Sequence, residues 1–244
     1  MQKVNLLIPM AGSGSRFKEK GYSLPKPLIN IFGKPMIQWV IDNFDSDLIE
    51  NYIFICRTEH ESDYGIKDKL NKMTGGKAKV YFVDKLTEGA ACTTLLAQES
   101  IDNETPLLMA NSDQFVEWNC KSFLDFCFQD IDGTILTFPS THPKWSYAKT
   151  DEHGFVTEVA EKKPISDRAT VGIYYWKKGI DYVKYANQMI SKNIRTNNEF
   201  YVCPVYNEAV QDNKKVKIFD IKESDMWGLG TPEDLSVFLV NYKN

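Results

Sequence analysis

The chain has no block of basic residues and no acidic tail. Its 29 Lys and Arg are scattered among 33 Asp and Glu, which leaves a formal net charge of −4. Nucleic-acid binders need a dense cationic surface, because neutralising backbone phosphates supplies much of their affinity. We therefore expect no nucleic-acid partner. A small anionic substrate remains compatible with this composition, since it needs only a few well-placed cations.

Long hydrophobic runs and paired cysteines are also missing. No apolar stretch approaches the roughly 20 residues that cross a bilayer, and the one at the N-terminus is too short for a signal peptide. The five cysteines form no CxxC pair, and only three histidines accompany them. Such a set argues against a disulfide framework and against a zinc site. We expect reduced cysteines in a cytoplasmic protein with no membrane partner; a homo-oligomer is left open.

Short apolar runs alternate with helical patterns through the first half of the chain. This alternation predicts a parallel sheet with helices on both faces. Ligands of such sheets bind beyond the carboxyl ends of the strands, which directs attention to the loops after Pro9 and Ala110. The predicted strands are 4–9, 51–56, 80–83 and 106–110, and the predicted helices are 36–44, 66–73 and 90–98.

The second half has several strand-like segments with no long helix between them, which favours antiparallel strands along one edge of the sheet. The predicted fold class is therefore α/β, a Rossmann-like and mostly parallel central sheet flanked by helices and extended by antiparallel strands in the C-terminal half. Thr231 before Pro232 is typical of a helix N-cap. The predicted strands are 133–139, 147–150, 155–159, 170–176 and 216–221, and the predicted helices are 179–192, 198–212 and 232–242.

A glycine-rich loop follows the first predicted strand, with Gly12 and Gly14 ahead of Arg16. Glycines let the backbone approach a phosphate, and successive N–H groups form a concave anion site. The P-loop pattern is absent, and the dinucleotide fingerprint fails because Phe17 stands at its third glycine. The pattern that fits is G-x-G-x-R followed by a Lys-Pro pair at Lys26. We interpret the loop as a phosphate site; a plain surface turn is the alternative.

The segments MAGSGSRF and LPKPLINIFGKPMIQWVIDNF resemble the opening of the sugar-phosphate nucleotidyltransferases, the nucleoside-diphosphate-sugar pyrophosphorylases. The resemblance is dense over residues 4–44 and returns in shorter blocks to about residue 235. It implies a magnesium-dependent enzyme that transfers the nucleoside monophosphate of a nucleoside triphosphate to a small phosphorylated acceptor and releases pyrophosphate. By this resemblance Ala11, Gly12, Gly14 and Arg16 hold the nucleotide, and Lys26 contacts the phosphate that is attacked.

The acidic residue Asp113 stands just after the predicted strand 106–110. Mg²⁺ in proteins prefers a few carboxylates together with waters and substrate phosphates, and the end of a buried strand is where an α/β enzyme can hold it. An Asx turn is the structural alternative. By the resemblance, Asp113 is the metal-binding aspartate, and Glu88, Gly89 and Ala90 form the loop whose backbone reads the nucleobase.

A second metal-binding aspartate stands in many family members two residues before a Gly-Thr pair near the end. In this chain that position is Gly228, ahead of Gly230 and Thr231. The departure puts a standard two-aspartate site in doubt. Asp225, three residues earlier, is our candidate for the second ligand.

The block Glu161-Lys162-Lys163-Pro164 resembles the family's Glu-Lys block on the acceptor side. The resemblance implies that Lys162 neutralises the acceptor phosphate, while Glu161, Gly172, Glu199 and Tyr201 contact the rest of the acceptor. Without this resemblance, a run of charged residues such as this one would usually be a solvated surface. We expect one domain over residues 1–244, with 1–130 as the nucleotide-binding half and 131–244 as the acceptor-binding half.

The ending WGLGTPEDL favours a subgroup linked to capsule and surface polysaccharide synthesis. Within it the chain resembles the cytidylyltransferases of capsule phosphoramidate synthesis, which implies CTP as the nucleotide and phosphoglutamine as the acceptor. For the family as a whole, the implied acceptor is a sugar 1-phosphate. Two other classes are alternatives: a metal-dependent glycosyltransferase, which the GxGxR…KP opening disfavours, and a non-catalytic nucleotide sensor.

Overall fold

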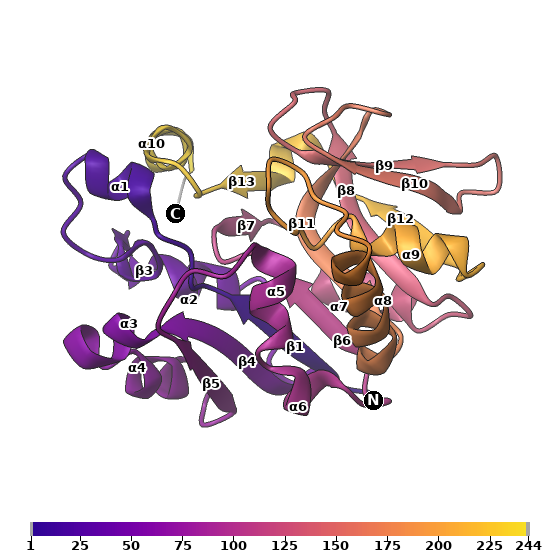
Figure 1. Ribbon diagram of the computed structural model, residues 1–244. Coiled ribbons are helices and arrows are strands. Elements are labelled where there is room, and N and C mark those ends of the chain that lie inside the picture. Colours follow the sequence, from indigo (N-terminus) through magenta and orange to yellow (C-terminus); the bar gives the residue numbers. More distant parts are fainter. Residues whose placement is uncertain (1, 243–244) are drawn as a thin grey trace.

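The computed structural model describes residues 2–242. One large sheet runs through both halves of the chain, and helices cover its two faces (Figure 1). Its strands are β1 (Val4–Pro9), β4 (Ile49–Arg57), β5 (Ala78–Val83), β6 (Leu107–Ala110), β8 (Gly133–Pro139), β9 (Ser146–Thr150), β10 (Val156–Glu161), β11 (Arg168–Trp176) and β12 (Val216–Asp220).

The described helices are short, apart from one of 13 residues after β11. They are α1 (Ser15–Glu19), α2 (Met36–Ile41), α3 (Thr58–Tyr64), α4 (Ile66–Met73), α5 (Ala90–Leu95), α6 (Gln98–Ile101), α7 (Cys120–Cys127), α8 (Gly179–Ser191), α9 (Val205–Gln211) and α10 (Pro232–Asn241), with 3₁₀ turns at η1 (Lys26–Leu28) and η2 (Glu223–Asp225). Two small antiparallel two-stranded sheets complete the fold, β2 (Asn30–Ile31) with β3 (Lys34–Pro35) and β7 (Gln114–Val116) with β13 (Met226–Gly228).

The sheet has a parallel centre and a mostly antiparallel extension. β1 pairs in parallel with β4 and β6, and β4 pairs in parallel with β5. β11 then lies antiparallel to β6, and the β9–β10 hairpin and β8 continue from β11 in antiparallel fashion. The predicted fold class is confirmed. One detail differs: β12 joins β8 in parallel, because α8 and α9 return the chain to the same end of the sheet.

Alternate residues of the central strands point to opposite faces, as the two-residue period of a strand requires. In β1, Leu6 and Ile8 face the core formed with α2, α4 and α7. Leu7 faces the second core, which is formed with α5, α6, α8 and α9. Both faces are therefore buried, which is why five of the six residues in β1 are apolar and only Asn5 is polar.

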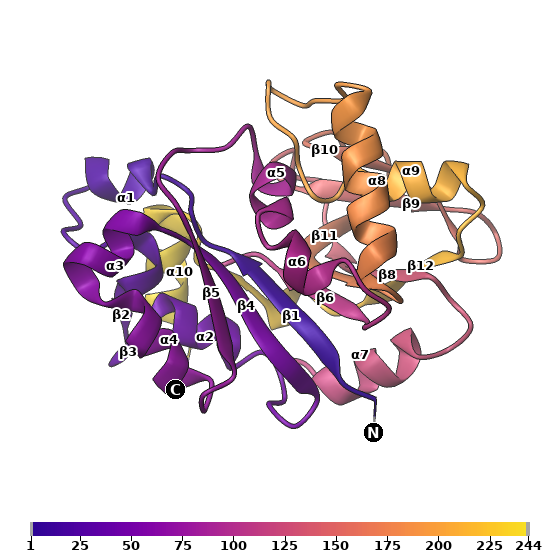
Figure 2. The same cartoon turned by 60° about the horizontal axis from the view of Figure 1, so that its bottom comes forward.

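The C-terminal helix packs against the start of the chain. Phe238 and Leu235 of α10 lie in a third core with Phe17, Trp39 and Leu229, and Figure 1 and Figure 2 both show α10 close to α1. The predicted N-cap is confirmed, because the Thr231 hydroxyl accepts a hydrogen bond from the Asp234 N–H at 3.0 Å. This packing brings the segment 228–231 to the carboxyl end of the central strands.

The predicted helix over 198–212 is wrong at its start, since α9 begins only at Val205. The Phe200 N–H instead donates to the Glu88 carbonyl, and the Phe200 carbonyl accepts from the Ala91 N–H, each at 2.9 Å. Phe200 is buried. Its backbone groups are thus engaged by a distant loop, a tertiary contact that local helix propensity does not contain. The predicted helix over 90–98 is likewise divided into α5 and α6.

None of the helices within residues 2–242 is long and apolar enough to cross a membrane. All five cysteines are free thiols, and four of them are buried.

Candidate active site

Two adjoining cavities lie beyond the carboxyl ends of β1 and β6. The first, the glycine-loop cavity, is bounded by residues 9–13, Lys26, the 86–93 segment and Asn111–Asp113. The second, the Glu161 cavity, has a volume of about 410 Å³ and is bounded mainly by the second half of the chain. Ala90, Asn111 and Asp113 line both. The two loops that strand polarity singled out, after Pro9 and after Ala110, therefore meet here.

Lys26 and Asp113 form an ion pair at the junction of the cavities. The Lys26 Nζ lies 2.7 Å from Asp113 Oδ2, and each side chain is only about a fifth exposed, at 20% and 23%. Gly230 allows this approach, because a Cβ there would lie 2.7 Å from the same carboxylate oxygen. Lys26 and Asp113, 87 positions apart in the sequence, are thus held together. An anion bound in either cavity would lie near both charges.

The glycine loop is shaped for an anion. Gly14 has a left-handed backbone (φ 61°, ψ 25°), which glycine adopts without strain. Among the described residues, no acceptor is hydrogen-bonded to the N–H groups of Gly12, Ser13 and Gly14. Arg16 is exposed, lines the Glu161 cavity and makes no ion pair with any described residue. Ala11 and Gly12 line the glycine-loop cavity.

The 88–90 loop is fixed by the 199–201 segment. Gly89 has φ 138° and ψ 174°, and a Cβ there would lie 2.4 Å from the Phe200 nitrogen and oxygen. Gly89 and Ala90 line the glycine-loop cavity. Glu88 lines neither of the two cavities; its carboxylate pairs with Arg195 instead. The loop therefore presents backbone and small side chains to the glycine-loop cavity.

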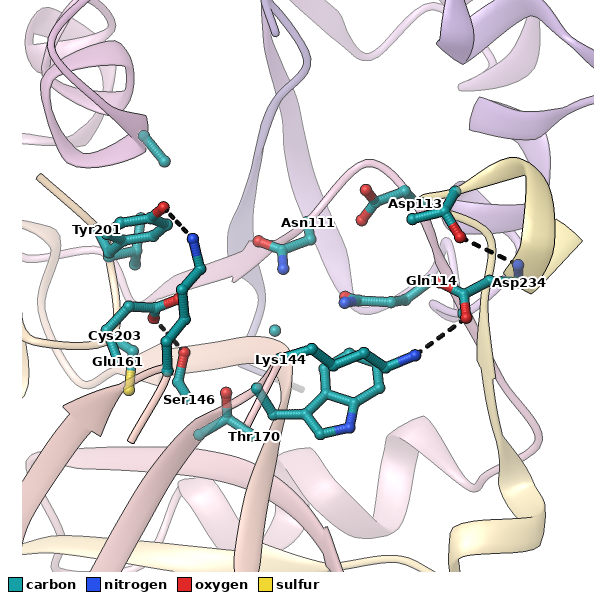
Figure 3. A pocket seen from close by; sticks show the side chains of 18 of the residues that line it. Asn111, Asp113, Gln114, Lys144, Ser146, Glu161, Thr170, Tyr201, Cys203 and Asp234 are labelled. Atoms are coloured by element: carbon teal, nitrogen blue, oxygen red, sulfur yellow. Dashed lines mark hydrogen bonds and ion pairs between the residues drawn. The ribbon is translucent and has the colours of Figure 1, made fainter. Parts of the chain in front are cut away.

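Glu161 and Lys162 line the Glu161 cavity, and Figure 3 shows Glu161 and Tyr201 on one wall of it. The Glu161 carboxylate accepts a hydrogen bond from the Ser146 hydroxyl. Burial raises the pKa of Glu161 above its ordinary value, although the bond from Ser146 opposes this shift. Lys162 Nζ donates to the Tyr201 hydroxyl at 2.6 Å and lies 4.7 Å from the centre of that ring. A hydrogen-bond acceptor, Glu161, and a cation, Lys162, thus both line this cavity.

Lys162 also has a backbone φ of 55°. A left-handed backbone is uncommon for a residue with a side chain, and such strain gathers at functional sites. The Lys162 N–H donates to the Trp145 carbonyl at 2.9 Å, which holds the residue in this conformation.

Gly172 forms the floor of the same cavity. The register of β11 shifts between Thr170 and Tyr174, and Gly172 has φ 93°. Its carbonyl accepts a hydrogen bond from the Asn111 N–H at 2.9 Å. Any side chain here would strike Asn111, whose Nδ2 lies 2.2 Å from the position of an added Cβ. A glycine is therefore required for the bulge to sit against the loop after β6.

The structure adds wall residues that the motifs did not indicate. Lys144 Nζ lies 3.0 Å from Asp234 Oδ1 and 4.5 Å from the centre of the Trp145 ring. With Gln114, these side chains form the part of the cavity opposite Tyr201 (Figure 3). Gln114 directly follows Asp113, so its place in the sequence could have predicted that it lies at the site. Lys144 and Asp234 meet across 90 residues and carry no local signal.

Besides Glu88, two further predicted site residues lie elsewhere than expected. Asp225 lines neither cavity; its carbonyl accepts from the Glu117 N–H at 2.8 Å and its carboxylate from the Ser224 hydroxyl at 2.9 Å. Glu199 lines the glycine-loop cavity rather than the Glu161 cavity, next to the 88–90 loop. The other carboxylate near the Gly228 turn is Asp234, which a Cβ on Gly228 would approach to 3.5 Å.

The residues present fit a magnesium ion that is held jointly by a protein carboxylate and by phosphates and waters. No cluster of three or more His, Cys, Asp or Glu within residues 2–242 is arranged to hold a metal, which disfavours a closed protein cage. Mg²⁺ bound with nucleotides commonly needs only one or two carboxylates, because phosphates and waters complete its octahedron. Asp113, partly exposed between two cavities, is suited to that role.

Residues 6–238 match the sequence profile described as nucleotidyl transferase. The chain belongs to the nucleotidyl transferase family. This match covers nearly the whole chain, and it confirms the family that the motifs indicated.

Curated relatives are distant in sequence. The bifunctional protein GlmU of Methanocaldococcus jannaschii is 25% identical over 180 residues, which cover 72% of this chain and 41% of that protein. The mannose-1-phosphate guanylyltransferase catalytic subunit beta of Drosophila melanogaster is 23% identical over 77% of this chain and 52% of its own length. The chain thus spans about half the length of these relatives.

Solved structures share the fold over nearly the entire chain. A nucleoside-diphosphate-sugar pyrophosphorylase from Vibrio cholerae has a TM-score of 0.85 at 24% identity, covering 97% of this chain and all of that one. The inositol-1-phosphate CTP transferase from T. maritima has a TM-score of 0.76 at 13% identity, covering 100% and 99%. These likenesses bear on the fold, and they agree with the mixed sheet described above.

Proposed function

We propose that the protein transfers a nucleoside monophosphate from a nucleoside triphosphate to the phosphate of a small acceptor, with release of pyrophosphate. The observation that carries this proposal is the Lys26–Asp113 pair at the junction of two cavities. One cavity is bounded by a glycine loop whose Gly12 and Ser13 N–H groups meet no acceptor within residues 2–242, and the other contains Lys162. Two phosphorylated substrates can therefore meet at a single pair of charges.

In this proposal the triphosphate lies over the backbone of Gly12 and Gly14. Arg16 stabilises the departing pyrophosphate, and Lys26 contacts the α-phosphate that is attacked. Lys162, positioned by the Tyr201 hydroxyl, neutralises the phosphate of the acceptor. The base lies against the backbone of the 88–90 loop, which Phe200 holds in place.

The chemistry needs positioned charge rather than a proton shuttle. An oxygen of the acceptor phosphate attacks the α-phosphorus in line and forms a new P–O bond. The bond from the α-phosphorus to the bridging oxygen breaks, and its electron pair leaves with pyrophosphate. The attacking oxygen is already anionic near neutral pH, so no general base is required. Catalysis then rests on orientation and on neutralising the developing charge.

Magnesium is part of the proposal, with Asp113 as its protein ligand. When bound, the ion would neutralise charge on the triphosphate. Asp225 stays our sequence-based candidate for a second ligand, although in this structure its carboxylate lines neither cavity. Lys26 would then share the Asp113 carboxylate with the metal or turn toward the nucleotide.

For the acceptor, we propose a sugar 1-phosphate or a small phospho-metabolite such as phosphoglutamine, with its body against Glu161, Gly172 and Tyr201. The names of the relatives support phosphorylated polyol or sugar acceptors. For the nucleotide we propose CTP, and for the setting a cytoplasmic step of capsule or surface polysaccharide synthesis. The WGLGTPEDL ending supports both.

Pyrophosphate release tests this function directly. Wild-type protein with Mg²⁺ is incubated with CTP, UTP, dTTP, ATP or GTP against a panel of sugar 1-phosphates and small phospho-metabolites. The proposal expects acceptor-dependent release with one nucleotide, and its loss in Asp113→Ala. NTP binding without release from any pair would instead support a nucleotide sensor. Release of a nucleoside diphosphate from a nucleotide-sugar would support a glycosyltransferase.

A further inference from the structure

Gln114 holds a buried carboxamide on the wall of the Glu161 cavity. The residue is 8% exposed, and within the described part of the chain no donor is hydrogen-bonded to its Oε1. Leaving a buried carbonyl oxygen without a donor destabilises a fold, and native proteins keep few such atoms. The side chain therefore needs an explanation other than folding stability.

The position of Gln114 is fixed through its backbone, without help from the side chain. Asn43 Nδ2 donates to the Gln114 carbonyl at 2.9 Å, and Asn43 Oδ1 accepts from the Val116 N–H at 2.8 Å. On the other side of β7, Gln114 pairs with Gly228 of β13. Two independent contacts thus hold this residue at the cavity, and its carboxamide takes no part in either.

The Gln114 carboxamide stands beside a second one, that of Asn111. An added Cβ on Gly172 would lie 2.5 Å from Gln114 Oε1 and 2.2 Å from Asn111 Nδ2. The two groups therefore approach the same face of Gly172, and Figure 3 shows both side chains directed into the cavity. The Asn111 Nδ2 donates to no described residue. An acceptor atom and a donor atom thus lie side by side on the cavity wall.

We propose that Gln114, together with Asn111, determines acceptor specificity by binding a neutral group that both donates and accepts a hydrogen bond, such as a hydroxyl. This inference rests on the proposed function, in which Lys162 on the facing wall holds the acceptor phosphate. A glutamine turns readily about its last side-chain bond, so Oε1 can leave Gly172 and face the bound acceptor. The recognised group then lies between the two amides.

The test compares Gln114→Met with wild type and with Gln129→Met, the same change at an exposed glutamine outside both cavities. Methionine keeps the length of the side chain and removes both polar atoms. Glucose 1-phosphate is the first acceptor probe, followed by the acceptor that the pyrophosphate panel selects. The readouts are KM for the acceptor, KM for the nucleotide, and the melting temperature.

We expect Gln114→Met to raise the acceptor KM about tenfold, as loss of a specific hydrogen bond does. The nucleotide KM should stay within about twofold, and the melting temperature should stay equal or rise, because an unpaired buried oxygen is gone. A deoxy acceptor lacking the recognised hydroxyl should show the same penalty with wild type and no further loss with the variant.

An unchanged acceptor KM, or an equal rise in both KM values, would overturn the inference while leaving the proposed function standing. A fall in melting temperature with no kinetic change would assign Gln114 to packing and would overturn it too. If wild type releases no pyrophosphate with any acceptor, the proposed function itself fails, and this inference fails with it.

Discussion

Substitution of Gly89 by alanine should destabilise the fold and weaken nucleotide binding together. Gly89 has φ 138° and ψ 174°, a region that only glycine occupies readily, at a cost of about 1–3 kcal/mol for other residues. A Cβ there would also lie 2.4 Å from backbone atoms of Phe200. Backbone cannot yield as a flexible side chain does, so the 88–91 and 199–201 segments must separate.

The expected loss is about 3 kcal/mol of unfolding free energy. Strain at Gly89 supplies about 2 kcal/mol, and the two hydrogen bonds with Phe200 supply about 1 kcal/mol each. The stiffer unfolded chain of the alanine variant returns roughly 0.4–1 kcal/mol. The matched control is Gly154→Ala, which has φ 78° but no atom within 4 Å of the added Cβ. It should lose only about 1 kcal/mol, from strain alone.

Urea denaturation of both variants measures the difference, and NTP titration measures the functional consequence. Gly89→Ala should bind the nucleotide at least about tenfold more weakly, since one wall of the glycine-loop cavity moves. Gly154→Ala should bind it normally. Equal stability losses within about 0.5 kcal/mol would refute the steric reasoning. Normal nucleotide binding by a destabilised Gly89→Ala would refute the assignment of this loop.

Three further predictions concern charges in the cavities. Asp113→Asn should lower kcat for pyrophosphate release about 10²–10³-fold, and chelation of Mg²⁺ should abolish release by wild type. Burial raises the pKa of Glu161 in the folded protein above its ordinary value of 4.5. Protonation of Glu161 therefore stabilises the fold fully below pH 4.5, and this stabilisation is lost as the pH rises through the raised pKa. Glu161→Gln should therefore melt no lower than wild type at pH 7 and show a flatter dependence of melting temperature on pH; a lower melting point there would contradict this. Asp234→Asn breaks a half-exposed pair with Lys144 and should cost under about 1 kcal/mol in urea denaturation, while the acceptor KM rises; a loss above about 2 kcal/mol would contradict the exposure argument.

The central strands were predictable because they are buried on both faces. The predicted bounds of β1 and β8 agree with the structure to the residue, and five of the six residues in β1 and six of the seven in β8 are buried. The helix predicted from residue 198 failed for the opposite reason. Phe200 gives its backbone hydrogen bonds to a loop more than 100 positions away, and no local pattern records such a partner.

The site was predictable where chemistry is local in sequence. Gly12, Arg16 and Lys26 belong to one motif, and Asp113 follows a buried strand, so strand polarity brings them together. The wall formed by Lys144 and Asp234 was not predictable. These residues meet only because α10 packs against the start of the chain and carries Asp234 to the cavity. From the sequence, Asp225 is accordingly the candidate second ligand, and Asp234 is not among the predicted site residues.

The fate of the α-phosphorus tests the central claim most directly. Wild-type protein, Mg²⁺ and CTP labelled at the α-phosphate are combined with the acceptor that the panel selects, and the labelled products are separated. The account predicts that all label passes to an acceptor-linked product, in equal amount to the pyrophosphate released, and that Asp113→Ala abolishes both. Label recovered in CDP or CMP, with no acceptor-linked product, would contradict nucleotidyl transfer.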